Sequence, residues 1–171
     1  MRTHQYRELT ECIPVIRRYA RALTNDMHRA DDLVQDCLER AWSRLHQFQQ
    51  GSNMRAWLFT IMHNIYANQA RRYNKTPQLV DIDTIADFPC SNSRQELNLE
   101  LYDLEYALQQ LPHEQREVLL LVGLEGMRYQ EVSDIIGIPV GTVMSRLYRA
   151  REKLRNIMEG DNSIKVQGIN D

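Results

Sequence analysis

Apolar side chains recur at intervals of about three and four residues along most of this chain, and this spacing constrains its fold more than any other feature. In residues 6–23 the recurrence places one apolar stripe along a helix, formed by Leu9, Ile13, Ile16, Ala20 and Leu23. Pro14 falls inside this segment and is expected to bend or locally break the helix. Because the 171 residues include seven glycines and five prolines, long helices are otherwise easy to build.

Two further segments carry the same pattern. Residues 28–45 are predicted to form a second helix, capped by Asn25 or Asp26. Its predicted core face consists of Leu33, Val34, Cys37, Leu38, Ala41, Trp42 and Leu45. A polar stretch at 47–53 leads into a third predicted helix at 54–73. The buried stripe of that helix consists of Trp57, Leu58, Ile61, Met62 and Ile65. Three helices of this length can enclose one core.

The second part of the chain begins with a change of composition. Pro77, Pro89 and scattered polar residues mark a linker. A new apolar pattern follows, formed by Leu97, Leu101, Leu104, Leu108 and Leu111. Pro112 interrupts this pattern, and a turn is expected between Gly123 and Gly126. Further helices are predicted over 113–122, 129–136 and 140–158.

Charge is distributed unevenly along the chain, although the net charge is −2. Residues 1–74 hold eleven Lys and Arg against seven Asp and Glu, and residues 141–158 hold five against one. Residues 75–100 hold two against five. A basic, acidic and basic order indicates two modules that face nucleic acid, joined by an acidic tether. The predicted fold is therefore all-α, with two small helical domains at 1–74 and 96–160, a flexible acidic linker at 75–95 and a polar tail at 161–171.

The cysteines and histidines, which often act in catalysis or bind metals, do not have the sequence spacing of a catalytic or metal-binding motif. Cys12, Cys37 and Cys90 are far apart, and the first two occupy apolar positions of helical patterns, which favours buried thiols in a reducing cytosol. The five histidines have no ligand spacing, and no glycine-rich phosphate loop occurs. We expect no enzyme activity, cofactor or metal. With no membrane-spanning run and no signal peptide, we expect a cytoplasmic protein.

Residues 129–155 carry the most specific motif, a predicted helix-turn-helix. A short amphipathic helix ends at Gly137, which can take the left-handed conformation that a tight turn requires. Ile138, Val143 and Leu147 have the spacing to hold the two helices together. The second helix can then enter a major groove. The alternative is an ordinary helical hairpin with a solvated basic face.

The amino-acid sequence in and around this motif resembles that of a known family. LPHEQREVLLL at 111–121 and GTVMSRLYRAR at 141–151 resemble the promoter-binding domain of extracytoplasmic function (ECF) sigma factors. ADDLVQD at 30–36 and RAWLFTI at 55–61 resemble the N-terminal domain of that family. The resemblance implies two helical domains, called regions 2 and 4, that bind core RNA polymerase and promoter DNA. It also implies an anti-sigma factor as a partner.

A ridge on the second predicted helix is the candidate polymerase-binding surface. Its residues have helical spacing on one face and suit a basic partner; they are Asp32, Gln35, Asp36 and Glu39. The family resemblance implies that this surface docks on the clamp helices of the largest polymerase subunit. Without the resemblance, a solvated acidic face is the simpler interpretation.

The loop at 47–53 and the exposed side of the third helix are expected to meet the −10 promoter element. The resemblance implies that a base flips from the separated strand into a pocket here, where amides can read it and aromatic rings can stack on it. The candidates are Phe48, Asn53, Asn64 and Asn68, with Arg71 and Arg72 for phosphate. Phe48 fits a core position equally well, and Trp57 and Phe59 are expected in the core.

The recognition helix is expected to read the −35 element. The resemblance assigns groove contacts to Met144, Ser145, Tyr148 and Arg149, with Thr142 and Arg146 near phosphate. Many relatives carry Arg or Lys where Met144 stands, and methionine cannot make the bidentate guanine contact of arginine. We therefore expect a shifted or weakened preference at that base pair. Arg128 occupies a predicted N-cap position that Ser or Thr would cap better.

Two matters stay open at the level of sequence. Acidic residues of the linker, Asp81, Asp83 and Asp87, can thread a basic polymerase channel built for RNA, or the linker can be a plain soluble tether. The function has two alternatives to a sigma factor: a stand-alone helix-turn-helix regulator, which leaves the N-terminal resemblance unexplained, and a sigma-like decoy that sequesters an anti-sigma factor.

Overall fold

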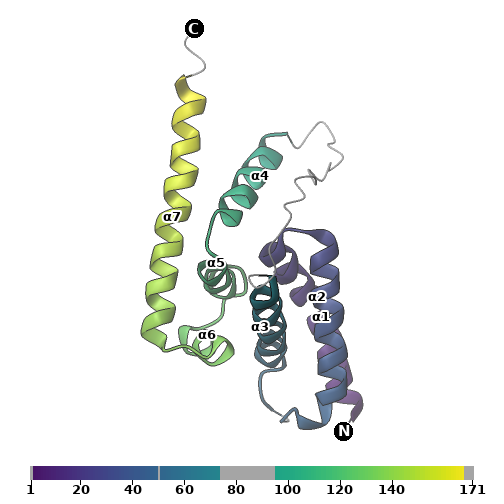
Figure 1. Ribbon diagram of the computed structural model, residues 1–171. Helices are drawn as coiled ribbons and strands as arrows, with labels where there is room; N and C mark the ends of the chain where they lie inside the picture. The colour runs from purple at the N-terminus through teal and green to yellow at the C-terminus, as the bar shows by residue number, and fades with distance from the viewer. Residues whose placement is uncertain (1, 50, 74–94, 168–171) are drawn as a thin grey trace.

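The computed structural model describes the chain at residues 2–49, 51–73 and 95–167, with side chains described at 4–49, 51–71 and 101–160. Every element in these ranges is helical (Figure 1). The N-terminal bundle consists of α1 (Arg2–Thr24), α2 (Met27–Arg44), the short η1 (Leu45–Gln47) and α3 (Met54–Tyr73). The C-terminal bundle consists of α4 (Gln95–Gln109), α5 (His113–Leu119), the π-helical turn η2 (Leu120–Leu124), α6 (Tyr129–Ile136) and α7 (Val140–Gln167).

Helix α1 runs through Pro14 without interruption, so the break expected there is absent. Proline removes the hydrogen bond that residue 14 would donate, and its ring crowds the preceding turn. The ring lies on the exposed side of α1, whereas Leu9, Ile16 and Leu23 are almost completely buried on the other side. Burial of this stripe against α2 and α3 offsets the cost of the proline.

Helix α2 begins and packs largely as its sequence predicts. Asp26 is the N-cap, and its carboxylate accepts a hydrogen bond from the backbone N–H of Arg29 at 2.9 Å. Leu33 and Cys37 are fully buried. The prediction for Trp42 is wrong, because 59% of this residue is exposed. Its ring leaves the core and packs against Tyr6 of α1, with centroids 4.8 Å apart.

Helix α3 completes the N-terminal bundle. Its predicted stripe is confirmed at Leu58, Met62 and Ile65, which are almost completely buried, while Trp57 is only half-buried. Phe59 is also buried, and its ring meets Tyr19 of α1 edge-on at 4.8 Å. The bundle therefore has the single core that three amphipathic helices predict.

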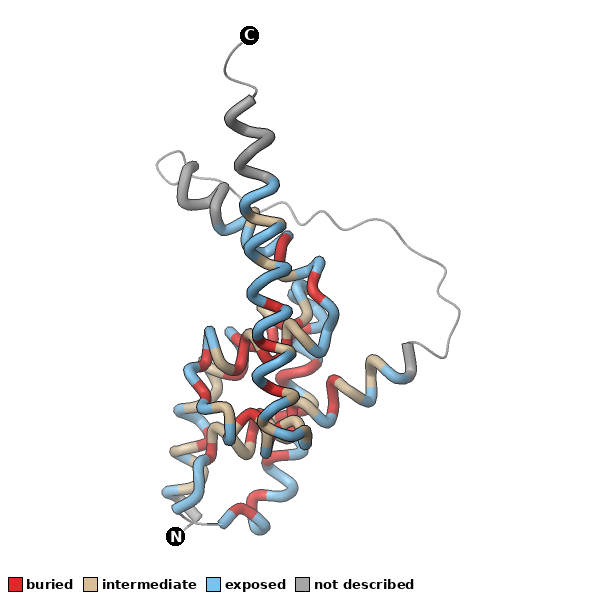
Figure 2. Tube along the Cα trace, turned by 90° about the vertical axis from the view of Figure 1, so that its left-hand side faces the viewer, coloured by how far each residue is buried: buried red, intermediate tan, exposed pale blue. Residues whose placement is uncertain are grey.

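The C-terminal bundle departs from its sequence pattern at both ends. Leu101 and Leu104 of α4 are exposed, at 55% and 37%, although they continue the stripe that ends in the buried Leu111. Helix α7 continues to Gln167, past the predicted tail boundary at residue 161. Between Gly160 and Gly168 no helix-breaking residue occurs, and extending an existing helix costs little. Figure 2 shows many exposed positions along the part of α7 whose side chains the structure describes.

The two bundles pack directly on each other. Helix α3 lies against α6, and α1 lies against α5 and η2. One continuous cluster of buried side chains joins both bundles, from Leu9 and Ile65 on one side to Val118 and Leu147 on the other. Figure 2 shows buried positions concentrated where the bundles meet. The predicted linker at 75–95, including its three aspartates, lies outside the described residues apart from Gln95.

Candidate polymerase and promoter interfaces

Helices α6 and α7 form the predicted helix-turn-helix. Gly137 ends α6 with a φ of 75°, the left-handed conformation that its position requires, and its N–H donates to the carbonyl of Ser133 at 2.9 Å. The hydroxyl of Ser133 donates to the carbonyl of Ile138 at 2.6 Å, which fixes the turn. Val143 and Leu147 are buried behind it. The angle between the two helices is therefore set by packing and by the turn together.

One face of α7 presents most of the predicted −35 residues to solvent. Met144 is 51% exposed and Tyr148 is 65% exposed. Ser145 and Arg149 are exposed beside them, and the Ser145 hydroxyl donates to the carbonyl of Thr142 at 3.0 Å. The large side chains of Met144 and Tyr148 are thus exposed to solvent and do not contribute to the core. Such exposure is typical of a surface that contacts a partner.

The two residues expected near phosphate lie differently. Thr142 is half-buried at the start of α7. Arg146 has a side chain that is 22% exposed, and its Nη2 pairs with Oε2 of Glu114 on α5 at 2.8 Å. In this arrangement Arg146 fastens the recognition helix to α5, so its guanidinium reaches DNA only if that pair opens.

The start of α6 compensates for its poor N-cap. Arg128 is the N-cap as predicted, and the Glu131 carboxylate accepts a hydrogen bond from the Arg128 backbone N–H at 2.9 Å. This supplies one half of a capping box. The other carboxylate oxygen of Glu131 accepts from Asn53 Nδ2 of the N-terminal bundle at 3.2 Å. One glutamate thus caps a helix and contacts a candidate −10 residue.

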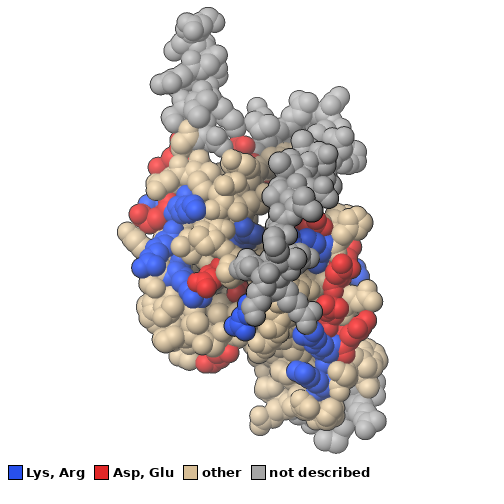
Figure 3. Space-filling view, in the orientation of Figure 1, with Lys and Arg blue, Asp and Glu red and all other residues tan. Residues whose placement is uncertain are grey.

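The candidate polymerase-binding ridge lies along α2. Asp32, Gln35 and Glu39 are exposed, and Asp36 is half-buried. The Gln35 amide donates to the Glu39 carboxylate at 3.2 Å, which ties together adjacent turns of the ridge. In Figure 3 acidic side chains gather on the right side of the molecule over α2, with arginines beside them. The ridge faces away from the C-terminal bundle and is open to a partner.

The candidate −10 residues are divided between surface and core. Asn64, Asn68 and Arg71 are exposed on α3, and the Asn64 amide donates to the carbonyl of Thr60 at 2.9 Å. The side chain of Arg72 lies outside the described residues. Phe48 is 5% exposed and packs on Trp57 with centroids 5.2 Å apart, so the structure favours its core alternative over base stacking.

Asn53 has a structural role in addition to its predicted one. Its Oδ1 accepts from the backbone N–H groups of Arg55 and Ala56, at 3.1 and 3.2 Å, which makes it the cap of α3. The same side chain reaches Glu131 through Nδ2. Helix α6 therefore covers the end of the predicted −10 surface in this arrangement.

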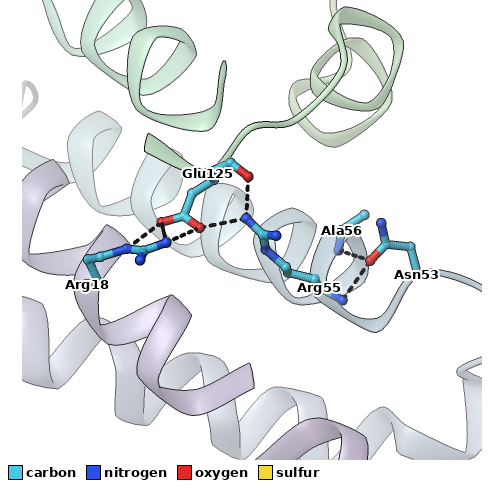
Figure 4. A network of polar contacts seen from close by, with 5 residues as sticks. All are labelled: Arg18, Asn53, Arg55, Ala56 and Glu125. Atoms are coloured by element: carbon cyan, nitrogen blue, oxygen red, sulfur yellow. Dashed lines mark hydrogen bonds and ion pairs between the residues drawn. The ribbon is translucent and has the colours of Figure 1, made fainter. Parts of the chain in front are cut away.

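A buried carboxylate joins the two bundles next to this point (Figure 4). The Glu125 side chain is 0% exposed and lies between two arginines of the N-terminal bundle. Arg18 of α1 approaches Oε1 with Nε and Nη2, at 3.2 and 3.1 Å, and Oε2 with Nη2 at 2.9 Å. Arg55 of α3 donates to Oε2 at 2.7 Å and to the Glu125 carbonyl. Two cations compensate one desolvated anion.

A second buried carboxylate crosses the same interface. Glu117 of α5 is 3% exposed, and its Oε1 lies 2.7 Å from Nδ1 of His63 on α3. Sequence reasoning missed both glutamates and their partners. Their positions in the sequence were the only available indication. Glu117 directly precedes an apolar run, and Glu125 lies between Leu124 and Gly126 instead of on a charged helix face.

Burial raises the thiol pKa of both described cysteines. Cys37 is buried, and desolvation raises the pKa of its thiol to about 12. Cys12 is half-buried, and burial raises its pKa as well, partly opposed by Arg55. Cys90 lies outside the described residues. Among the side chains that the structure describes, no group of three or more acidic, His or Cys residues is placed to hold a metal. No helix in the described ranges is long and apolar enough to cross a membrane.

Comparison with known proteins places this geometry in a family. Residues 9–63 match the family model described as the Sigma2 domain of PhyR, and residues 101–154 match the model for Sigma-70, region 4. The chain is 38% identical to the ECF RNA polymerase sigma factor EcfG of Rhodopseudomonas palustris, over 91% of this chain and 86% of that protein. The chain belongs to the ECF sigma factors. It is also 27% identical to the ECF sigma factor SigM of Bacillus subtilis, over 90% of both chains.

Two solved structures share the fold of this ECF sigma factor. The sigma factor RpoE of Bartonella quintana, crystallised with the anti-sigma factor NepR, superposes with a TM-score of 0.77 at 36% identity. That match covers 90% of this chain and 96% of RpoE. CnrH, solved with the cytosolic domain of CnrY, superposes with a TM-score of 0.67 at 26% identity, covering 94% and 91%. The resemblance seen in the sequence is thereby confirmed, as is the all-α fold with two sigma domains.

Proposed function

We propose that this ECF sigma factor binds core RNA polymerase in the cytoplasm and directs it to a subset of promoters, as a transcription regulator without catalytic activity of its own. The observation that carries the proposal is the pairing of two surfaces in one chain. An acidic ridge lies open on α2, and a recognition helix presents exposed groove-reading side chains on α7. A stand-alone regulator needs the second surface but not the first.

The division of labour follows the two bundles. Region 2, at 1–74, docks on polymerase through the ridge and reads the −10 element through Asn53, Asn64 and Asn68. Region 4, at 96–160, reads the −35 element through α7. The linker at 75–95 joins the two regions, and α7 carries the chain beyond residue 160. Polymerase fixes the spacing of the two regions, so two weak DNA contacts act as one strong contact.

An anti-sigma factor is the proposed regulator. RpoE of Bartonella quintana, 36% identical to this chain, was crystallised with the anti-sigma factor NepR. In this chain Leu101, Leu104 and Tyr106 of α4 are exposed on the C-terminal bundle. An exposed apolar surface of this kind suits a protein partner, because its removal from water on binding is favourable in free energy.

In vitro transcription tests the proposed function. Core RNA polymerase, this protein and a genomic promoter library are mixed, and transcript starts are mapped. We expect discrete new starts that share a two-part upstream motif. Binding to core without new starts would point to a decoy or an inhibitor. Absence of binding to core would leave a stand-alone regulator.

A pair of matched variants tests the ridge in the same assay. Asp32→Asn with Glu39→Gln removes two exposed charges from the ridge, and we expect weaker binding to core at low salt. Glu11→Gln removes an exposed charge from α1, outside the four ridge residues, and we expect unchanged binding. Equal affinities for core in all three proteins would remove the ridge from the polymerase interface.

A further inference from the structure

Arg18 and Arg55 converge on one carboxylate and so form an anion-binding site. The anion, Glu125, belongs to the other bundle. Both guanidinium groups stand on region 2, whereas Glu125, which fills the site, follows η2 in region 4. The carboxylate is 0% exposed, while the arginine side chains keep 55% and 36% exposure. The site is therefore reached from solvent on the arginine side, and its occupant leaves whenever the two regions separate.

Region 2 holds Arg55 in place independently of Glu125. The Arg55 guanidinium lies over the ring of Phe59, one turn further along α3, with 5.8 Å between its central carbon and the ring centroid. Its Nε is buried and has no hydrogen-bond partner among the described residues. A buried donor without an acceptor costs free energy. Glu125 therefore leaves one Arg55 donor unused, and an anion that replaces Glu125 can pair with it once the departure of region 4 uncovers Nε.

In the packed arrangement, region 4 contacts one of the predicted −10 residues. Glu131 of α6 holds Asn53, and Glu125 holds the neighbouring Arg55 (Figure 4). When α6 and η2 move away, Arg18 and Arg55 lose their shared anion at once. Two arginines that converge on one point then attract an anion of matching geometry.

We propose that Arg18 and Arg55 bind a backbone phosphate of the −10 strand when the regions are apart, and that Glu125 occupies the same site when they are packed together. This inference rests on the proposed function. Arginine forks bind phosphate and carboxylate with the same bidentate geometry, so one site serves both anions. A nucleic-acid phosphate is favoured over an acidic protein surface because Arg55 lies two residues after Asn53, at the predicted base-reading loop. Glu125 is then a competitor of DNA.

Binding of single-stranded DNA to the free, full-length protein tests this competition. The probe is a short fluorescein-labelled oligonucleotide of mixed sequence, because phosphate contacts do not depend on base sequence. Fluorescence anisotropy gives the affinity over a range of salt concentrations. Glu125→Gln removes the competing charge, and we expect about tenfold tighter binding than in the unmodified protein. Circular dichroism spectra check that each variant retains its helices.

A matched pair in the opened background isolates the arginine site. Glu125→Gln with Arg18→Gln is compared with Glu125→Gln with Arg17→Gln, where Arg17 is the exposed neighbour on α1. We expect the double variant that lacks Arg18 to bind more weakly. The slope of its log affinity against log salt should be smaller in magnitude by about 0.7, the value for one phosphate on a single strand. Equal affinity and slope in the two pairs would overturn the proposal, as would unchanged binding in Glu125→Gln alone.

The DNA-binding assay contains no polymerase, so its outcome does not depend on whether the protein acts as a sigma factor. A protein that starts no transcription and still shows the pattern retains the anion site and loses the sigma function. In the holoenzyme, we expect Arg18→Gln to lower open-complex formation several-fold while core binding is retained. Loss of core binding with unchanged DNA affinity would assign the arginines to an acidic polymerase surface and overturn the proposal.

Discussion

Arg116 is predicted to be the most important single charge for stability, because it closes two helix ends at once. Its Nε donates to the carbonyl of Leu108 at 2.8 Å, and Nη2 donates to those of Gln109 and Leu111 at 2.8 and 3.1 Å. Its Nη1 donates to the carbonyl of Leu23 at 3.0 Å, at the end of α1. Carbonyls at helix C-termini have no partner within the helix. The guanidinium is half-buried, and this desolvation lowers the pKa of Arg116 because it disfavours the charged form.

Substitution Arg116→Met keeps much of the apolar stem and deletes all four bonds. A hydrogen bond from a charged donor contributes about 1.5–3 kcal/mol, and bonds that share one side chain do not add. Since some carbonyls regain water, we expect a loss of about 3 kcal/mol in the free energy of unfolding. Arg116→Lys supplies one compact ammonium that cannot reach both helix ends, so we expect a loss of about 2 kcal/mol.

Urea titration followed by circular dichroism measures both losses. Arg128→Met is the control, since Arg128 is exposed and its hydrogen bond to Glu131 uses the backbone N–H, and we expect a change within about 0.5 kcal/mol. Full stability in Arg116→Lys would show that charge alone suffices and would refute the geometric argument. A change below about 1 kcal/mol in Arg116→Met would show that water replaces the guanidinium without cost.

Three further predictions concern the recognition helix, its turn and a buried thiol. Gly137→Ala forces an alanine into a left-handed conformation and meets no other atom within 4 Å, so strain alone should cost about 1–2 kcal/mol, seen as a lower Tm. Met144→Arg should create a preference for guanine at one −35 position, and an unchanged preference in a sequence-library binding assay would contradict the assigned contact. Cys37, with a pKa of about 12, should resist thiol reagents at neutral pH until the protein unfolds. Because this pKa is raised in the folded state, the stability that the neutral thiol contributes should fall as pH rises above about 9, which pH-dependent urea titration can follow.

Local pattern predicted the helices well where one face alone is buried. The stripe of α1 and the left-handed Gly137 both follow from spacing and from the steric freedom of glycine. Trp42 was misplaced because helical spacing gives its face but not how far the neighbouring helices extend over it. Leu101 and Leu104 were misplaced for the same reason, since α4 projects beyond the elements that would cover it.

The candidate site was predictable at its exposed residues and not at its buried ones. Met144 and Tyr148 follow from their position on a recognisable motif. Glu125 pairs with residues 107 and 70 positions away in the sequence, and no local pattern carries such information. The family resemblance places Arg146 near phosphate, whereas its pairing with Glu114 depends on how α5 and α7 pack. Long-range ion pairs are set by tertiary structure, so sequence periodicity gives no indication of them.

The separation of Arg18 and Glu125 also has a consequence during synthesis of the chain. The ribosome adds about 5–20 residues per second, so Glu125 is made on the order of five to twenty seconds after Arg18. Because N-terminal domains generally fold first during translation, region 2 is expected to fold while its arginine pair still has no carboxylate. For that interval the two arginines lack the anion that they pair with in the folded protein, and the pairing forms only after region 4 has been made.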